Sequence, residues 1–489
     1  MRKIAFVASE AVPFAKTGGL ADVAGTLPRV LEKLGCEVKL FIPKYYSIDE
    51  IKFNLKYNWK IGEIPIKVAG HIRSVHILQS KLPNSNVEVN FVDCPHYFNR
   101  ALLYTNDFDE DERFILFSKG VIETLQRLNW APDVIHCNDW QTGLIPLLLK
   151  DNYSWDKFFK NTHTIFTIHN IGYQGKFAKD ALAKADIDER YFYPTGPIEF
   201  YNDVSFMKAG ISFADIITTV SPTYAKEILT REYGAGMENI LIQRKESLFG
   251  IINGVDYSTW DPETDVQIPF NYSVNSLEEK IKNKEYLLKQ FGMPFKKEIP
   301  LIGIVSRIVE QKGFDLFAEA INDLIKLNAQ WIILGSGEEK FEDLIRWLVK
   351  SYPEKFGAYI MFSDILSHLV EAGSDMFLMP SRYEPCGLNQ IYSLKYGSVP
   401  IVRNTGGLAD TVRNWHDGKS KNDESGTGFS FNDYSSSALL ETVRRAIKTF
   451  EDKIIWRKTQ SNGMKENFSW DSSAKEYINL YNLVAQKGN

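Results

Sequence analysis

The chain has 489 residues, of which 44% are hydrophobic and 24% charged, and 57 basic against 62 acidic residues give a formal net charge of −5. This length exceeds what one hydrophobic core supports, so we expect two or three domains. The small net charge argues against partners bound by bulk electrostatics, such as nucleic acid or an anionic membrane.

The start of the chain predicts neither a leader nor a membrane anchor. Only a few apolar residues precede Ser9 and Glu10, too few for the core of a signal peptide. No run approaches the roughly 18 apolar residues that a membrane helix needs. The four cysteines are widely spaced and form no CxxC pair, which indicates neither a disulfide framework nor a zinc site. We therefore expect a reduced, cytoplasmic enzyme that uses no cofactor.

The first part of the chain opens like a parallel α/β layer. Residues 3–8 (KIAFVA) are typical of a buried strand, and a loop that ends in KTGGL follows. Residues 20–34 carry apolar side chains at helical spacing, and Gly35 is in the position that commonly ends a helix. Residues 37–42 predict a second strand. The order strand, glycine turn, helix and strand favours a Rossmann-like domain.

The pattern changes between residues 61 and 95. Two segments with a period of two flank a PNSN turn there, which predicts an antiparallel ribbon inserted in the first domain. The α/β alternation then resumes, and we expect the first domain to span residues 1–253. Its later strands are predicted at residues 133–137, 164–168, 215–220 and 250–252.

A second α/β series begins near residue 300 and predicts a second Rossmann-like domain over residues 254–464. Residues 256–275 contain many turn formers and no strong periodicity, which indicates an interdomain linker. Residues 471–485 predict an amphipathic helix after the second sheet is complete, so we expect residues 465–489 to return to the first domain. The fold class is thus α/β, with two Rossmann-like domains facing across a deep cleft that holds the ligand.

The stretch from Ser381 to Asp410 suits a ligand that has both a sugar and phosphates. Glu384 precedes a helix start at Gly387. Its carboxylate can accept sugar hydroxyls, and the free N–H groups at the helix start can bind phosphate oxygens. A surface glutamate is the alternative. Cys386 is interpreted as a small buried residue, not a nucleophile, because no histidine adjoins it.

Cations follow two other predicted strands. Lys16 lies in the KTGGL turn, whose glycines allow backbone to approach an anion, although an ordinary tight turn is the alternative. The turn matches neither the GxGxxG nor the P-loop motif, which gives little support for NAD binding or nucleotide hydrolysis. Arg307 and Lys312 follow the strand that begins at Leu301, where they can hold a diphosphate without a metal. Solvated surface charges are the alternative for both.

His169 and Asp139 also end predicted strands. A satisfied buried histidine is the alternative for His169, and the N-cap of the helix that begins at Thr142 is the alternative for Asp139. His136 and Cys137 adjoin Asp139, but no second cluster completes a coordination set. The sequence therefore predicts no metal site.

Eight motifs together resemble the family of bacterial glycogen synthases and plant starch synthases. They run in the family's order from Lys16 to Val412: KTGGLADV, HCNDWQTGL, TIHNIGYQG, SPTYAKEI, GIINGVD, SRIVEQKG, SRYEPCGLNQIYSLKYG and NTGGLADTV. The family consists of retaining glucosyltransferases with the GT-B fold. The resemblance implies transfer of glucose from ADP-glucose to the non-reducing end of an α-1,4-glucan, with UDP-glucose as the alternative donor.

The resemblance also implies residue roles. Arg307 and Lys312 would neutralise the departing diphosphate, and Glu384 would bind glucose hydroxyls. His169 would hold the glucose 6-hydroxyl, and Asp139 would support the sugar and the acceptor. The other implied substrate contacts are Lys16, Gly18, Gly19 and Asn253 near the donor, the backbone of Cys386, Gly387 and Leu388, the turn of Thr405, Gly406 and Gly407 along the distal phosphate and ribose, Phe362 on the adenine, and Tyr97 on the acceptor side.

The chain departs from the family at two positions. Gln141 stands where many members have histidine, and Phe362 stands where members often have tyrosine. Two other classes stay open. A pyridoxal-phosphate glucan phosphorylase would carry a Schiff-base lysine, and an inactive glucan-binding protein would lack the cationic set. The joint presence of Lys16, Arg307, Lys312 and Glu384 argues against the inactive glucan-binding protein.

Overall fold

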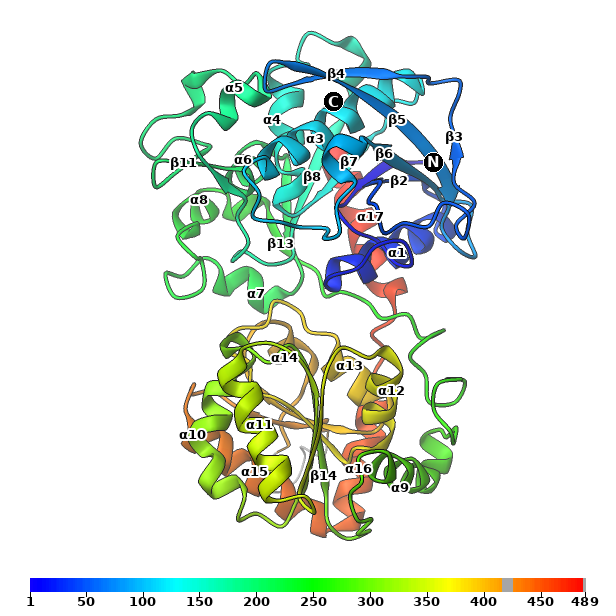
Figure 1. The fold of residues 1–489 in the computed structure, drawn as a ribbon, viewed down its shortest axis with the longest axis vertical. Helices are drawn as coiled ribbons and strands as arrows, with labels where there is room; N and C mark the ends of the chain where they lie inside the picture. The colour runs from blue at the N-terminus through cyan, green and yellow to red at the C-terminus, as the bar shows by residue number, and fades with distance from the viewer. Residues whose placement is uncertain (416–424, 487–489) are drawn as a thin grey trace. The chain divides into compact units, whose positions relative to one another are not determined.

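The computed structural model describes residues 1–415 and 425–486. The chain divides into two compact units (Figure 1). Unit 1 consists of Met1–Gly254 and Trp470–Asn489, and unit 2 of Val255–Ser469. The C-terminal residues 487–489, which we expected to belong with the first domain, lie outside the described part.

The main sheet of unit 1 has the strand order β13-β12-β8-β7-β1-β2-β6-β5-β3, and β4 pairs with β5. Pairing is parallel from β13 to β6 and antiparallel beyond it. The strands are β1 Lys3–Val7, β2 Glu37–Pro43, β3 Lys56–Tyr57, β4 Ile64–Val68, β5 His71–Lys81, β6 Glu88–Asp93, β7 Val134–Asn138, β8 His163–Ile168, β12 Ile216–Thr219 and β13 Leu248–Gly250.

The ribbon predicted between residues 61 and 95 is part of this sheet. Strands β5 and β6 pair antiparallel, as their alternation indicated. However, β6 also pairs in parallel with β2, so the ribbon extends the main sheet and is not a separate insertion. The alternation of apolar and polar residues along a strand shows which face of the strand is buried. It does not show which strand pairs with its other edge, here β2 beside β6.

The helices of unit 1 pack on the sheet's faces. They include α17, which comes from the C-terminal end of the chain. Helix α17 packs against α1, and the Tyr481 hydroxyl on α17 lies 2.8 Å from His136 Nδ1 in β7. The helices are α1 Gly19–Lys33, α2 Pro95–Phe98, α3 Glu110–Arg127, α4 Leu144–Lys150, α5 Ala181–Ala185, α6 Phe206–Phe213, α7 Pro222–Glu227, α8 Glu238–Gln243 and α17 Trp470–Gln486, and a small sheet holds β9 Lys176–Phe177, β10 Glu199–Phe200 and β11 Asp203–Ser205.

Unit 2 is built on a parallel sheet in the order β16-β15-β14-β17-β18-β19. In Figure 1, α10, α11 and α15 lie on one side of this sheet, and α9, α12 and α13 on the other. The elements are α9 Lys280–Gln290, β14 Leu301–Val305, α10 Phe314–Leu324, β15 Gln330–Gly335, α11 Glu339–Ser351, β16 Phe356–Ile360, α12 Asp364–Gly373, β17 Met376–Met379, α13 Asn389–Lys395, β18 Val399–Arg403, α14 Gly406–Thr411, β19 Phe429–Phe431, α15 Ser436–Glu451 and α16 Lys453–Met464.

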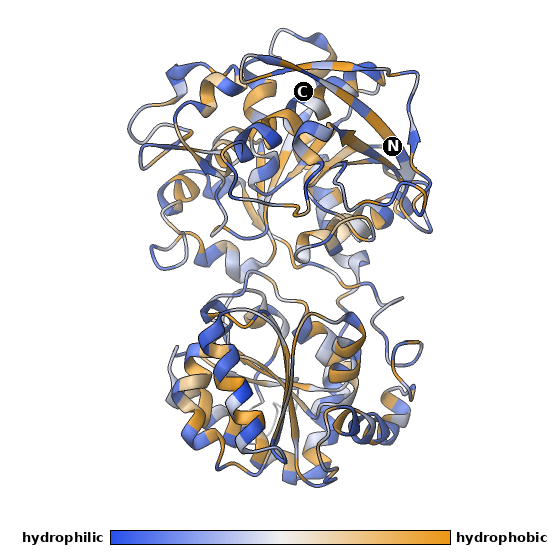
Figure 2. Ribbon diagram, viewed as in Figure 1, coloured by the Kyte–Doolittle hydropathy of each residue, from blue (hydrophilic) through white to orange (hydrophobic). Residues whose placement is uncertain are grey.

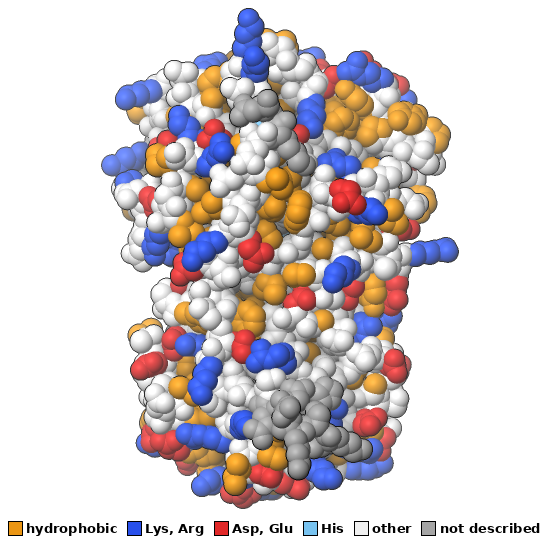
Figure 3. Space-filling view, turned by 180° about the vertical axis from the view of Figure 1, so that it is seen from behind, with side chains coloured by type: hydrophobic (Ala, Val, Ile, Leu, Met, Phe, Trp, Pro, Cys, Tyr) orange, Lys and Arg blue, Asp and Glu red, His pale blue; other side chains and the backbone are white. Residues whose placement is uncertain are grey.

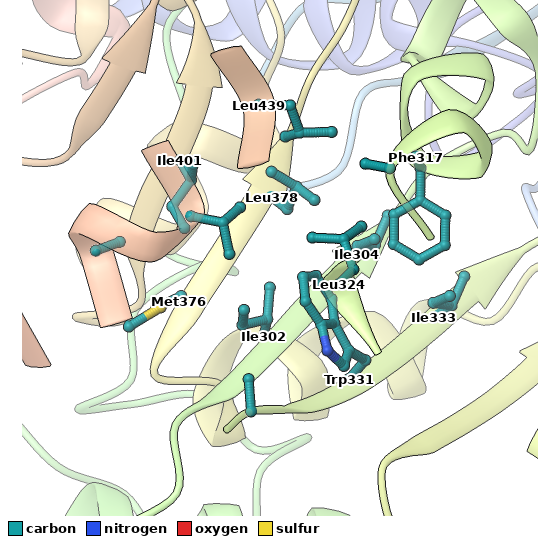
Figure 4. Close-up of a cluster of buried hydrophobic side chains, with 14 of the residues drawn as sticks. Ile302, Ile304, Phe317, Leu324, Trp331, Ile333, Met376, Leu378, Ile401 and Leu439 are labelled. Atoms are coloured by element: carbon teal, nitrogen blue, oxygen red, sulfur yellow. The ribbon is translucent and has the colours of Figure 1, made fainter. Parts of the chain in front are cut away.

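Both faces of the unit 2 sheet are buried, which is why its strands are almost continuously apolar (Figure 2). Successive residues of β14 point to opposite faces. Ile302 and Ile304 join the cluster around Trp331 and Phe317 (Figure 4), while Leu301 joins the core on the other face. The two cores fix the sheet, and hence the loops at its carboxyl edge.

Residues 256–275, which we interpreted as a linker, are part of unit 2. The Trp260 ring stacks between His368 and Tyr392, with centroid distances of 3.6 and 3.8 Å. Asp265 is buried, and its Oδ2 lies 2.7 Å from His368 Nδ1. The segment lacks periodicity because single aromatic and polar residues, not a regular face, attach it to the unit.

Acidic and basic side chains are interspersed on the face shown in Figure 3, without a broad patch of one sign among the described residues. This agrees with the weak electrostatic signal of the composition. No helix in the described ranges is long and apolar enough to cross a membrane.

Candidate functional site

In unit 1, Asp139 and His169 follow the neighbouring parallel strands β7 and β8, so they lie at one edge of the sheet. The backbone N–H of His169 donates to Asp139 Oδ1 at 2.8 Å. Asp139 occupies the N-cap position of the short helical turn Trp140–Thr142, as the alternative had it, but its side chain makes no capping bond to that turn. Its φ of +56° with ψ of 179° is a region that residues other than glycine rarely adopt. Such strain is typical of functional positions.

Burial raises the pKa of Asp139 to about 7, although the backbone N–H groups of His169 and Asn170 oppose the rise by donating to it. The negative charge of Glu10 adds to the rise. Asp139 therefore changes its charge near neutral pH, unlike an ordinary surface aspartate.

The imidazole of His169 is oriented by Asn138, which sequence reasoning passed over although it lies in the HCNDWQTGL motif. Asn138 Nδ2 donates to the Val7 carbonyl at 3.0 Å, which turns Oδ1 toward His169 Nε2 at 2.9 Å. We assign the proton to Nε2 on this network. Burial lowers the pKa of His169 to about 3, so the ring is neutral. Its Nδ1 has no partner in the described chain and can accept a hydroxyl proton.

The loop before α1 is held by Glu10, a buried carboxylate that the sequence did not single out. Glu10 Oε2 accepts from the Thr17 N–H and hydroxyl at 2.5 and 2.8 Å and from the Gly18 N–H at 3.4 Å. Lys16 Nζ lies 2.8 Å from Asp22 Oδ1. The Gly18 amide, expected on the donor phosphate, is therefore bonded within the protein. The only signal for Glu10 was its place shortly after β1, which ends at Val7.

Tyr97 does not support the acceptor role expected of it. Its side chain is fully buried, and its hydroxyl donates to Glu112 Oε2 at 2.7 Å. The Arg73 guanidinium lies 5.5 Å from its ring centroid. These contacts make Tyr97 a core residue. The hydroxyl of nearby Tyr104 lies 2.7 Å from Ser9 Oγ, and a pocket of about 650 Å³ adjoins Tyr104, lined by residues 100–102 and 104–107.

In unit 2, Lys312 and Glu384 follow the neighbouring parallel strands β14 and β17 and form an ion pair. Lys312 Nζ lies 2.6 Å from Glu384 Oε2, and the Ser381 hydroxyl donates to the same oxygen at 3.0 Å. Glu384 is 5% exposed, so it is not a surface glutamate. Both of these bonds go to Oε2, and Oε1 receives no hydrogen bond from the described residues, so it keeps its capacity to accept one.

Arg307 lies on the same loop as Lys312 and is exposed. Its Nη2 donates to Gln311 Oε1 at 3.1 Å. The loop thus presents two cations after β14, one paired with a buried carboxylate and one near solvent. Cations placed in this way can form charge-assisted hydrogen bonds with phosphate oxygens.

The turn at 405–407 packs directly on the Glu384 segment. A Cβ on Gly406, which has φ of +46°, would lie 1.9 Å from the Glu384 carbonyl oxygen. The Gly407 N–H donates to that same oxygen at 3.1 Å. In the turn expected to line the distal phosphate and ribose, this amide is therefore bonded within the protein. By contrast, the N–H groups of Gly387 and Leu388 find no acceptor in the described chain. These two residues directly precede α13.

The remaining candidates differ in their surroundings. Asn253 is buried, and its Oδ1 has no donor within the described residues, as is also true of Gln141 Oε1. Phe362 is 76% exposed between β16 and α12, where its ring is open to stacking. Cys386 and Thr405 are buried. Within residues 1–415 and 425–486, no group of three or more His, Cys, Asp or Glu side chains could hold a metal ion.

Known proteins with similar sequences cover both units. Residues 3–243 match the family model of the starch synthase catalytic domain, and residues 288–460 match that of glycosyl transferases group 1. The glycogen synthase of Koribacter versatilis is 46% identical over 99% of this chain and 98% of its own length. The glycogen synthase of Thermotoga maritima is 43% identical over 99% of each chain.

Two solved structures are also similar. The catalytic domain of Starch Synthase IV from Arabidopsis thaliana, bound to ADP and acarbose, superposes with a TM-score of 0.92 at 31% identity and 99% coverage of both chains. The sucrose-phosphate synthase of Thermosynechococcus elongatus has a TM-score of 0.61 at 17% identity over 99% of both chains, a likeness that concerns the fold alone.

Proposed function

The chain belongs to the glycogen synthase family of glycosyltransferases, and we propose that it extends an α-1,4-glucan at its non-reducing end with glucose from ADP-glucose, retaining the α configuration. The family and the two-domain GT-B fold class were both predicted from the sequence and are confirmed by these similarities. ADP-glucose is favoured as the donor because the related plant starch synthase was solved with ADP.

The observation that carries the proposal is the pairing of Lys312 with Glu384 beside Arg307. Glycosyl transfer passes through an electron-deficient anomeric carbon and needs a stabilised leaving group. Arg307 and Lys312 neutralise the charge that develops on the departing diphosphate, so no general acid is required. Glu384 accepts glucose hydroxyls through its Oε1 and thereby places the anomeric carbon.

The bond changes follow from this arrangement. The acceptor 4-hydroxyl attacks the anomeric carbon on the face from which the diphosphate leaves. The bond from carbon to phosphate oxygen breaks, the new glycosidic bond forms, and a phosphate oxygen takes the proton of the acceptor hydroxyl. Same-face attack retains the configuration without a nucleophilic carboxylate. The N–H groups of Gly387 and Leu388 bind the phosphate oxygens.

The residues of unit 1 serve the sugar and the acceptor in this proposal. The free Nδ1 of neutral His169 accepts the glucose 6-hydroxyl, and ionised Asp139 fixes the backbone of His169. Lys16 and the open backbone of Gly19 contact the donor phosphate. Asn253 lies near the donor, where its Oδ1 can accept a hydrogen bond.

In unit 2, Phe362 stacks on the adenine, and the turn of Thr405 and Gly406 supports the distal phosphate and ribose through the Glu384 segment. We place the enzyme in the cytoplasm, where glucan and nucleotide sugar would meet.

The test is the initial rate of glucan elongation with ADP-glucose and with UDP-glucose, using glycogen as the acceptor and a chelator in the buffer. We expect elongation with ADP-glucose that the chelator does not reduce. Preference for UDP-glucose would overturn the donor but keep the chemistry. Binding of ADP-glucose without transfer would favour the inactive glucan-binding alternative.

A further inference from the structure

The loop before α1 depends on a buried carboxylate that the proposed reaction leaves without a role. Glu10 is 3% exposed and lies three residues beyond the end of β1 at Val7. One of its oxygens, Oε2, accepts the N–H and the hydroxyl of Thr17 and the N–H of Gly18. Because these donors lie on successive residues, they restrict the backbone of the loop at two consecutive positions.

We propose that Glu10 is a positioning residue for donor binding, holding residues 16–19 in the conformation that presents Lys16 and Gly19 to the donor phosphate. The inference rests on the proposed function, because it takes the donor to be a nucleoside diphosphate sugar. Glu10 acts through the loop and does not itself touch the reacting atoms.

The loop is supported on one side and open on the other. A Cβ on Gly18 would lie 3.5 Å from Glu10 Oε1, whereas a Cβ on Gly19 would meet no atom within 4 Å. The N-cap residue of α1 is Gly18, which has no side chain to cap the helix. Glu10 supplies a side-chain acceptor near the start of α1 instead. The backbone at Gly19 therefore leaves room for a ligand.

The direction of Lys16 also depends on the backbone that Glu10 fixes. The Lys16 side chain is 41% exposed, and its Nζ lies 2.8 Å from Oδ1 of the partly exposed Asp22. An exposed ion pair of this kind orients a lysine only weakly. The backbone conformation of Thr17 and Gly18 consequently sets the position from which the Lys16 side chain extends. Burial raises the pKa of Glu10, and the loop's hydrogen bonds oppose that rise, so the loop and the charge stabilise each other.

The experiment compares Glu10→Ala, Glu10→Gln and a control, Glu88→Gln. Glu88 lies in β6 of the same unit and pairs with Lys39 at 2.7 Å, away from the loop. We measure kcat, the KM values for ADP-glucose and glycogen, and the Kd of ADP by calorimetry. For Glu10→Ala we expect the ADP-glucose KM and the ADP Kd to rise about ten- to a hundredfold, as for loss of hydrogen bonds to a charged group. The glycogen KM should not change, Glu10→Gln should recover part of the loss, and the control should match the wild type.

A double variant separates positioning from a structural role. If Glu10 acts through the loop that carries Lys16 and Gly19, then Glu10→Ala should weaken ADP binding by a smaller factor in the Lys16→Ala background than in the wild type. Losses that multiply would overturn the proposal. So would a Glu10→Ala protein with a lower Tm but an unchanged ADP Kd and ADP-glucose KM. Should Glu10→Ala fail to fold, Glu10→Gln and Thr17→Val carry the same comparison.

The wild-type protein separates this proposal from the proposed function. A wild type that binds ADP but transfers no glucose would overturn the function, while the ADP Kd values would still decide the role of Glu10. A wild type that does not bind ADP would overturn both.

Discussion

The ion pair of Lys312 and Glu384 makes a quantitative prediction through a double-mutant cycle. We consider Glu384→Ala, Lys312→Ala and the double variant. Glu384→Ala should lower kcat about 10²- to 10³-fold, roughly 2.7–4 kcal/mol, as when a preorganised group at the reacting centre is lost. Lys312→Ala should raise the ADP-glucose KM and lower kcat, because charge on the departing diphosphate is less well compensated.

The structure sets the expected coupling between the two residues. Their charged atoms lie 2.6 Å apart, and their side chains are 19% and 7% exposed for Lys312 and Glu384 respectively. A charged hydrogen bond this well buried contributes about 1.5–3 kcal/mol. The double variant should therefore retain about ten- to a hundredfold more kcat/KM than the product of the single losses predicts.

The assay is the initial rate of glucan elongation with ADP-glucose, with circular dichroism to verify that each variant folds. The pair Lys296 and Glu354 is the matched control, because its charged atoms are also close, 3.1 Å, but its side chains lie in solvent, 45% and 72% exposed. Alanine there should change neither rate nor coupling. Additive losses at Lys312 and Glu384 would refute the reasoning, because they would mean that the pair does not act as a unit during turnover.

Three further predictions concern single residues. Because ionised Asp139 is needed and its pKa is about 7, kcat should fall as pH drops through 7, and this acid limb should be absent from Asp139→Asn. The raised pKa also means that protonated Asp139 adds stability below about pH 4 that is lost as pH rises through 7, so urea titrations should show a smaller pH dependence in Asp139→Asn. Gly406→Ala should destabilise unit 2 by about 1–3 kcal/mol and lower its Tm, because its Cβ would meet a carbonyl oxygen, whereas Gly19→Ala should leave the Tm nearly unchanged. Phe362→Ala should raise the ADP-glucose KM and leave the Tm unchanged, since the ring is exposed; equal KM values would exclude Phe362 from the base site.

Much of the fold could be predicted because its signals are local. Apolar runs, helical spacing and glycine turns each report on a few neighbouring residues, and they located β1, α1 and β2 within one or two positions. Residues 256–275 escaped this reasoning. Their attachment to unit 2 depends on contacts such as Trp260 on His368, more than a hundred residues away, which no local pattern reveals.

The candidate site shows the same division. The residue types at the strand ends were evident, because carboxyl ends of parallel strands collect ligand-binding groups. The sequence did not show which backbone amides are already hydrogen-bonded within the protein. Gly18 and Gly407 donate to Glu10 and to the Glu384 carbonyl, and the Tyr97 hydroxyl donates to Glu112. These bonds satisfy buried polar groups, and their geometry exists only once the layers have packed.

The sequence by itself determined the family, the two α/β series and the chemical groups available to a nucleotide sugar, because these depend on residue identity and short-range order. Only the tertiary structure decided which groups meet. Lys312 and Glu384 are 72 residues apart, and they pair because β14 and β17 are neighbours in the sheet although they are not consecutive in the chain. Strand order is set by how whole helices and sheets bury their apolar faces, and that balance is a property of the folded chain, not of any one segment.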